Sequence, residues 1–126
     1  DDIPQITCVK TEIQQVILNL LKNAAYAVGK KNYVDSHPRI TIRLKKEGQM
    51  IRLDVSDNGI GMDSETKKRV FEPFFTTKET GMGTGLGLSV SYFIITNNHG
   101  GQMEVDSAHG IGTTFTVRLP TMIRPS

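Results

Sequence analysis

Asp57 is the residue whose type and position most strongly suggest chemistry. It follows an alternating apolar run from Ile51 to Val55 and keeps the parity of that run, so in a strand it would point to the same face, toward the interior. A buried carboxylate is costly unless something hydrogen-bonds it. Glycines at 59 and 61 suit a backbone that bends sharply or approaches a ligand closely. We interpret the run from Asp57 to Met62 as one wall of a pocket.

The glycines form a second signal. Eight of the 12 fall in three clusters, at 59 and 61, at 81, 83, 85 and 87, and at 110 and 112. The middle cluster opens a predicted helix, where amide groups and a positive helix end favour a phosphate chain. Ordinary turns would explain any one cluster equally well, but three in one small domain favour a functional site. The sequence has no GxxxxGK[ST] run and no βαβ context for the middle cluster, so Walker-type and Rossmann sites are poorly supported.

Two asparagines and a threonine could complete the pocket. Asn19 and Asn23 are one helical turn apart on one flank of an apolar stripe, and oxygen ligands of this kind suit Mg²⁺, which keeps several waters and borrows phosphate oxygens. They could also be ordinary surface amides of the helix. Thr113 begins the last predicted strand with inward parity, so its hydroxyl could join Asp57 in reading the edge of a base. For Thr113 alone, a polar strand end is the simpler explanation.

The elements that must position these residues follow from periodicity. The order predicts an α+β fold, a two-layer α/β sandwich in which about three helices cover one face of a mixed, mostly antiparallel sheet of about five strands. Thr11-Glu12-Ile13-Gln14 has the form of a capping box at the first helix. The predicted elements are an opening strand around Ile6 and Cys8, helix Glu12–Val28, strands Arg39–Lys45 and Met50–Asp57, helix Ser64–Val70, helix Leu86–Asn98, and strands Gln102–Asp106 and Thr113–Leu119. In the first hairpin, Ile40, Ile42 and Leu44 should share a buried face with the apolar residues of the second strand.

Composition limits the protein class. The 126 residues, with 37% hydrophobic and 22% charged residues, suit one globular domain. A net charge of +2 is too small to argue for nucleic acid or a membrane as partner, and we expect neither to contact this domain directly. Cys8 is alone, which excludes an intrachain disulfide and fits a reducing, cytoplasmic location. No apolar run approaches the length of a membrane span, and residues 1–126 show no signal-peptide pattern. We expect residues 1–126 to be a single domain of a longer protein, whose other parts could anchor it to a membrane.

Five segments together resemble a known family. They are NLLKNA at 19–24, DNGIGM at 57–62, FEPFFTTK at 71–78, GMGTGLGLS at 81–89 and GIGTTF at 110–115. In order, they resemble the N, G1, F, G2 and G3 boxes of sensor histidine kinases, and five boxes in order are highly specific. The resemblance implies the ATP-binding catalytic domain of a two-component histidine kinase, with the Bergerat fold of the GHKL superfamily that DNA gyrase and heat-shock chaperone ATPases share.

This resemblance implies a site for ATP and Mg²⁺. Asn23 would coordinate the metal and Asn19 would lie beside the phosphates. Asp57 would bind the adenine amino group with help from Thr113, and residues 71–78 and 81–85 would form a lid. Lys78 is the candidate cation for the γ-phosphate, so Asn19 and Lys78 are the candidate catalytic residues. The full set of expected cofactor-binding residues is Asn19, Asn23, Tyr26, Asp57, Gly59, Gly61, Met62, Phe74, Thr77, Lys78, Gly83, Thr84, Gly85, Leu86, Gly87, Leu88 and Thr113.

The sequence departs from the family pattern at Tyr26. Many sensor kinases carry Lys or Arg three residues after the second asparagine, facing the phosphates, so here the cation must come from elsewhere. Lys22 is a weaker substitute than Lys78 because its helical angle turns it away from the asparagine flank. The short lid resembles that of the nitrogen-regulator group of sensor kinases.

None of the three histidines of the sequence fits the family's phosphoacceptor. His37, His99 and His109 lie in predicted loops or helix ends, and none has the helical context followed by an acidic residue that the family's acceptor shows. We therefore expect the acceptor on a separate domain, N-terminal to Asp1 in a homodimeric parent protein, and a response regulator as downstream partner. The isolated chain should bind ATP but barely phosphorylate itself.

Other functions remain open at this stage. Gyrase- and chaperone-type hydrolases carry a Glu four residues before the metal-binding Asn, where this chain has Asn19, and a neutral amide cannot act as general base. The FEPFFTTK segment fits the serine kinases among anti-sigma factors poorly. A nucleotide-gated interaction module, which would report ATP to a partner without transferring phosphate, is the non-enzymatic alternative.

Overall fold

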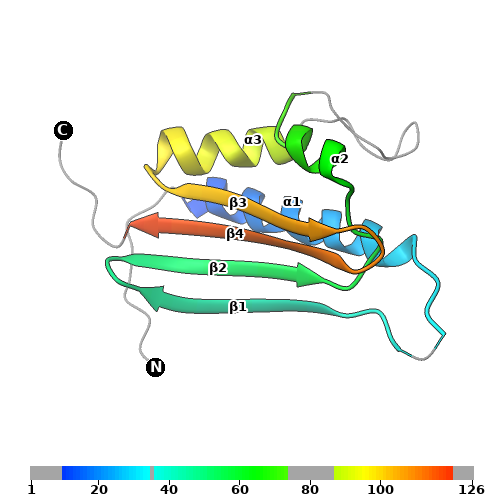
Figure 1. Ribbon diagram of the computed structural model, residues 1–126. Coiled ribbons are helices and arrows are strands. Elements are labelled where there is room, and N and C mark those ends of the chain that lie inside the picture. The colour runs from blue at the N-terminus through cyan, green and yellow to red at the C-terminus, as the bar shows by residue number, and fades with distance from the viewer. Residues whose placement is uncertain (1–9, 35, 74–86, 121–126) are drawn as a thin grey trace.

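Alternating sequences build one four-stranded antiparallel sheet in the part of the chain that the structure describes. The structure is a computed structural model that describes residues 10–34, 36–73 and 87–120. The strands lie in the order β1-β2-β4-β3 (Figure 1). Their bounds are Ile40–Glu47 for β1, Met50–Asp57 for β2, Gln102–Ala108 for β3 and Gly112–Pro120 for β4.

The register of the central pair positions the residues of interest. β2 and β4 are antiparallel neighbours, with Val55 opposite Phe115 and Asp57 opposite Thr113. Val55 and Phe115 are almost fully buried. Because side chains alternate along each strand, Asp57 and Thr113 point to the same face as this core pair.

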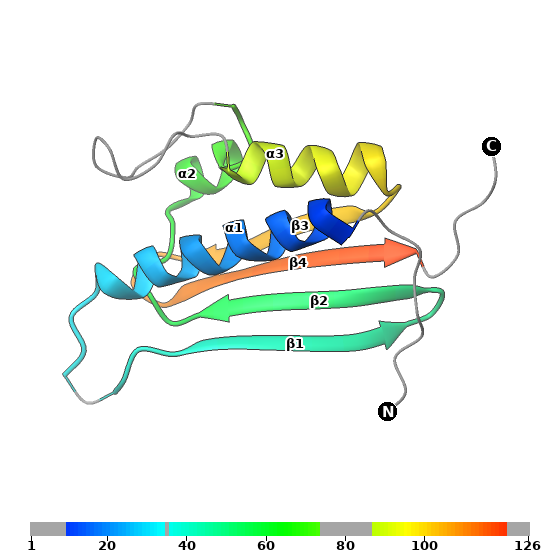
Figure 2. The ribbon, with the colours of Figure 1, turned by 180° about the vertical axis from the view of Figure 1, so that it is seen from behind.

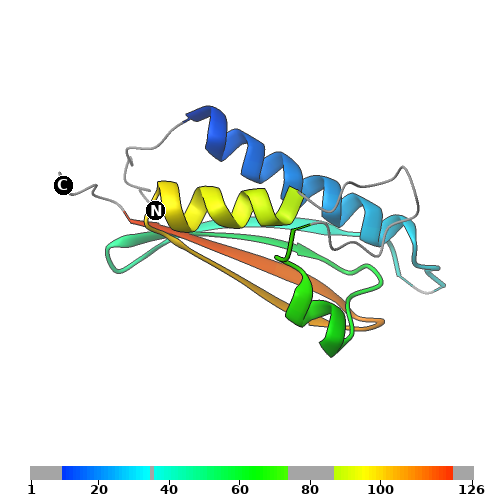
Figure 3. The same ribbon diagram turned by 90° about the horizontal axis from the view of Figure 1, so that it is seen from above.

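The helices pack around that face. α1 (Lys10–Gly29) and α3 (Gly87–Phe93) lie side by side on it, and α2 (Ser64–Arg69) lies beside β3 (Figure 3). α3 continues into one π-helical segment, η1 (Ile94–Asn98). The stripe of α1 that meets the sheet consists of small and branched apolar residues at helical spacing. The core includes Val16, Leu20, Ala24, Val55, Ile94, Ile95, Met103, Phe115, Val117 and Leu119.

The architecture confirms the predicted α+β sandwich, with small differences. The predicted helix at 86–98 is an α-helix followed by a π-helical turn, and every strand pairing among the described residues is antiparallel. α2 begins after Asp63, whose carboxylate accepts a hydrogen bond from the Thr66 N–H at 2.8 Å, an ordinary N-cap. The predicted opening strand lies outside the described residues.

One expectation about β1 is wrong. Ile40, Ile42 and Leu44 were expected on a buried face, but 37%, 53% and 53% of their surfaces are exposed. Their opposite residues on β2 include the buried Val55. The reason is that α1 packs on β2 and β4, and Figure 2 shows β1 running below α1 and uncovered by it.

The opposite face of the sheet is polar. Arg118 Nε of β4 donates to Glu47 of β1 at 2.7 Å, and Thr116 Oγ1 of β4 donates to Asp54 of β2 at 2.7 Å, so polar side chains on this face join β4 to both β1 and β2. The hydrogen bond from Arg118, and a second from Arg52 Nη1 at 3.1 Å, hold the pKa of Glu47 below its usual range. A satisfied polar face opposite the helices confirms that the sheet buries one face only.

Candidate functional site

Asp57 is a buried acid at the end of β2. It is 9% exposed, and its Oδ1 accepts a hydrogen bond from the Gly59 N–H at 2.8 Å. Burial raises the pKa of Asp57, and the backbone amides of Gly59 and Thr113 and the positive charge of Lys31 oppose that rise. The protein therefore keeps a costly carboxylate at the end of its core, as the alternation of β2 predicted.

A cluster of hydroxyl groups adjoins Asp57. Thr113 is 5% exposed, and its Oγ1 lies 2.7 Å from Ser107 Oγ. The Met62 N–H donates to the same Ser107 oxygen at 2.8 Å, and Ser107 Oγ donates to the carbonyl oxygen of Gly112 at 3.0 Å. An open depression of about 230 Å³ at this end of the sheet is lined by Asp57, Ser107, Gly112 and Thr113, and also by Asp106 and Thr114, which have the opposite, outward parity. Asp57, Thr113 and Ser107 thus form a compact polar group in which Asp57 is the ionisable member.

Ser107 was missed in the sequence. Its only signal there is its place in the last hairpin. The glycine turn sets the register of β3 and β4, and this register puts Ser107 opposite Thr113. Ser107 could have been identified from the pairing of the two strands, because opposite residues in an antiparallel pair point to the same face.

Asn58 ties the loop after α1 to the site. Its Nδ2 donates to the His37 carbonyl at 2.8 Å and its Oδ1 accepts from the Arg39 N–H at 2.7 Å. Tyr33 Oη donates to the Asn58 carbonyl at 2.8 Å. Lys31 Nζ donates to the carbonyls of Asn58 at 3.2 Å and Gly110 at 2.9 Å. The cation near Asp57 is thus also a link between three loops.

The glycines beside Asp57 fit against the protein's own backbone. A Cβ on Gly59 would overlap the backbone at Ala27, and one on Gly61, whose φ is +68°, would overlap the carbonyl of Ala108. These contacts join the end of α1 to the β3–β4 turn through the 57–62 loop. The structure accounts for both glycines without a ligand, and their part in making room for a base remains a prediction.

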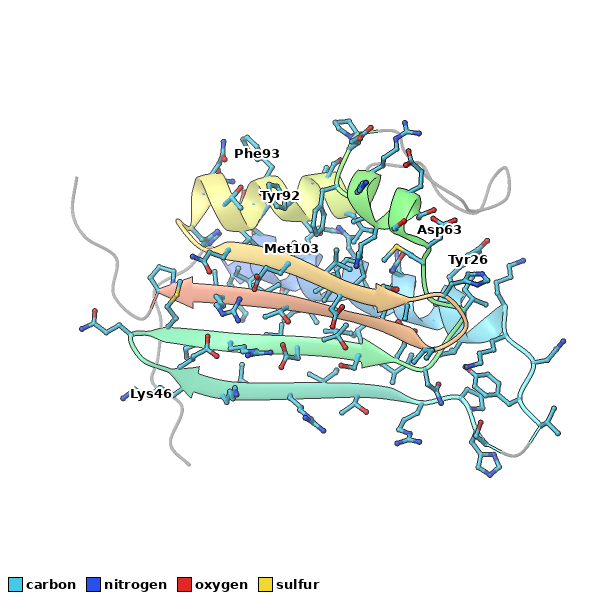
Figure 4. The ribbon with its side chains drawn as sticks, in the orientation of Figure 1. Tyr26, Lys46, Asp63, Tyr92, Phe93 and Met103 are labelled. Atoms are coloured by element: carbon cyan, nitrogen blue, oxygen red, sulfur yellow. The ribbon has the colours of Figure 1, made fainter. Side chains whose placement is uncertain are left out.

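The two asparagines of α1 have different surroundings. Asn19 Nδ2 donates to the Gly87 carbonyl and to Ser91 Oγ, both at 3.0 Å, so it joins α1 to the first turn of α3. Asn23 is half-buried, and no side-chain hydrogen bond joins it to another residue within 10–34, 36–73 or 87–120. Tyr26 lies toward the end of the molecule where β2 ends (Figure 4), with Lys30 Nζ 5.3 Å from its ring centre.

The structure thus brings together Asp57, Thr113 and the 59–62 loop in one group, and Asn19 and Gly87 in another. Met62 and Leu88 pack against the hydrophobic core, and whether they also touch a nucleotide remains a prediction. The remaining expected residues lie outside the described residues. They are Phe74, Thr77, Lys78, Gly83, Thr84, Gly85 and Leu86.

The side-chain oxygens near the site fit a magnesium ion that is held mostly by water and substrate phosphates. Within the described segments, no group of three or more His, Cys, Asp or Glu side chains could hold a metal. The half-buried amide of Asn23 offers one oxygen. Mg²⁺ commonly binds through one or two protein oxygens with water and substrate phosphates, and this donor set suits that mode.

The comparisons with known proteins establish the family. Residues 8–123 match the family described as histidine kinase-, DNA gyrase B- and HSP90-like ATPase. The chain is 32% identical to a solved catalytic domain of histidine kinase ThkA, with a TM-score of 0.77 over 93% of this chain and 71% of that one. The chain belongs to this ATPase family and, within it, to the histidine kinase catalytic domains. ATP is therefore the cofactor that its family supports.

Curated relatives are longer proteins with the same kind of domain. The chain is 42% identical over 120 residues to sporulation kinase E of Bacillus subtilis, covering 95% of this chain and 15% of that protein. It is 37% identical over 123 residues to sensor histidine kinase ZraS of Escherichia coli K12, covering 98% of this chain and 24% of that protein. The chain thus spans a quarter or less of these two relatives. None of the helices in the described segments combines the length and apolarity that a membrane crossing needs.

Proposed function

We propose that this domain binds ATP with Mg²⁺ and transfers the γ-phosphate to a histidine on a separate phosphoacceptor domain of its parent protein. The observation that carries the proposal is the buried Asp57 opposite Thr113, in a chain whose family consists of ATP-binding domains. A buried carboxylate in such a place is retained for recognition, since burial alone makes it costly.

The proposed pose places the adenine at the Asp57 end. Asp57 would accept from the exocyclic amino group, and the phosphates would run toward α1, where Asn23 offers an oxygen to Mg²⁺. Lys78 would supply the cation at the γ-phosphate, because Tyr26 occupies the usual position of a basic residue. Positioning and charge neutralisation are the main contributions that a protein makes to phosphoryl transfer.

Asn19 supports transfer over hydrolysis. Its amide is engaged by Gln15, Gly87 and Ser91, and an amide cannot take a proton from water as a carboxylate can. The acceptor is then a histidine of another domain, in a homodimeric parent that passes the phosphate to a response regulator. A cytoplasmic location is part of the same proposal.

The test is a calorimetric titration with ATP and Mg²⁺. Asp57→Asn should raise the Kd at least about tenfold, roughly 1.4 kcal/mol, because the amide turns a donor toward the amino group of the base. Asp54→Asn is the matched control, since Asp54 is on the same strand but bonds to Thr116 and Arg52 on the outer face. Titrations with a chelator in place of Mg²⁺ should show weaker binding. Equal affinity of the Asp57→Asn variant and the native chain would remove Asp57 from the site.

A further inference from the structure

Ser107 and Thr113 beside Asp57 have one hydroxyl proton each, and their contacts determine where each proton is directed. Ser107 Oγ receives the Met62 N–H at 2.8 Å and lies 3.0 Å from the Gly112 carbonyl oxygen, which can only accept. A serine hydroxyl has one proton, and the carbonyl of Gly112 takes it. The 2.7 Å contact between Ser107 Oγ and Thr113 Oγ1 must then use the proton of Thr113.

This arrangement determines what Thr113 can offer to a ligand. With its proton directed at Ser107, the Thr113 oxygen is left with lone pairs only and acts as an acceptor. Asp57, directly opposite on β2, is an acceptor when ionised. Two acceptors side by side match an amino group or a bridging water that donates, and they oppose a carbonyl oxygen, which would leave buried polar groups unpaired.

We propose that Ser107 is a positioning residue for base recognition, which holds Thr113 as an acceptor and thereby selects a 6-aminopurine nucleotide over a 6-oxopurine nucleotide. The proposal rests on the proposed function, because it assumes that Asp57 and Thr113 meet the base. The inference goes beyond the proposed function because it names a residue on β3 that sets the selectivity through its hydrogen bond with Thr113.

A second hydroxyl pair in the sheet provides a comparison. Ser56 Oγ and Thr114 Oγ1 lie 2.8 Å apart on the outer face of β2 and β4. That pair forms the same kind of cross-strand contact as Ser107 and Thr113. If the cross-strand contact mattered only for the stability of the sheet, removing either serine would have the same effect on nucleotide choice. If Ser107 orients Thr113, only its removal should change the preference.

The experiment measures the Kd of ATP and of inosine triphosphate, which carries a carbonyl in place of the amino group. The native chain, Ser107→Ala, Ser107→Thr and Ser56→Ala are compared. In Ser107→Ala the Thr113 hydroxyl is free to turn and donate, so the preference for ATP should fall by about tenfold, the discrimination expected from one buried hydrogen bond. Ser107→Thr keeps a hydroxyl and should retain the native ratio, as should Ser56→Ala.

The outcomes separate this inference from the function on which it rests. An unchanged ratio of the two Kd values in Ser107→Ala, or an equal change in Ser56→Ala, overturns the inference while ATP binding stands. Failure of the native chain to bind ATP overturns both. Should Ser107→Ala not fold, Ser107→Cys carries the same prediction, because a thiol keeps the shape of the side chain but is a weak acceptor for the Thr113 proton.

Discussion

Asp57 shows a balance between stability and recognition at the level of one residue. Burial raises the pKa of its carboxyl, while the amides of Gly59 and Thr113 and the charge of Lys31 lower it in part. The folded state therefore binds a proton at Asp57 more tightly than the unfolded chain does. A site that must accept from a base keeps this acid ionised, at a cost to the fold.

The raised pKa of Asp57 predicts that the stability of the fold depends on pH. Because the pKa is raised on folding, the stabilising contribution of this group is present at low pH and is lost as pH rises through the folded-state pKa. The native chain should therefore gain stability relative to Asp57→Asn as pH falls from about 7 to about 4. Urea unfolding of both proteins across this range measures it.

Lys31→Met tests whether the positive charge of Lys31 lowers the pKa of Asp57. Loss of the cation should raise the pKa of Asp57 further. As pH falls, the gain in stability should therefore begin at higher pH than in the native chain. Lys45→Met, at an exposed position of β1, should leave the profile unchanged. A stability difference between the native chain and Asp57→Asn that is constant with pH would contradict the raised pKa.

At the scale of elements, the site depends on how closely three segments approach one another. The end of α1, the 57–62 loop and the β3–β4 turn meet through glycines. The Gly110 N–H donates to the Ile60 carbonyl at 2.6 Å, and the Ile60 N–H donates to the Ala27 carbonyl at 3.2 Å. The glycine clusters of the sequence are therefore explained in part by protein packing, and the recognition residues owe their positions to it.

Two glycines of one turn should respond differently to substitution. Both Gly110 and Gly112 have positive φ, at +82° and +150°, but a Cβ on Gly110 meets open space while one on Gly112 overlaps the Asp57 carbonyl. Gly110→Ala should cost about 1–2 kcal/mol of unfolding free energy from backbone strain alone. Gly112→Ala should cost at least about 3 kcal/mol and also weaken ATP binding, since it displaces Asp57. Chemical denaturation and titration measure both, and equal costs would show that the turn adapts.

At the scale of the whole molecule, none of the three histidines lies on the exposed surface of a helix, where the family's phosphoacceptor is expected. His99 is buried, with Nδ1 2.9 Å from the Ile94 carbonyl. His109 is exposed in the β3–β4 turn, and His37 is exposed in the loop between α1 and β1. None resembles a phosphoacceptor presented on a helix surface.

This arrangement predicts transfer in trans. With labelled ATP and the helical phosphoacceptor domain of a related sensor kinase, the label should appear on that domain as an acid-labile, base-stable phosphate and barely on this chain. The acceptor domain with its histidine replaced is the control. Label on this chain at high stoichiometry would contradict the separate acceptor, and tight ATP binding without any transfer would favour an interaction module.

The sequence by itself determined the inward face of Asp57, the helix that carries Asn19 and Asn23, the hairpins and the order of the five boxes. Each rests on a local regularity, either the period of two in a strand or 3.6 in a helix, or the spacing within a short motif. Such regularities are readable because neighbours along the chain produce them.

Only the tertiary structure decided what surrounds these residues. It brought Ser107 to Thr113, tied Asn58 to the loop after α1, joined Asn19 to Gly87 and left the apolar side chains of β1 exposed. Parity states which face a side chain takes but not whether a helix covers that face. These contacts depend on strand register and helix placement, which are set by packing between segments far apart in the chain.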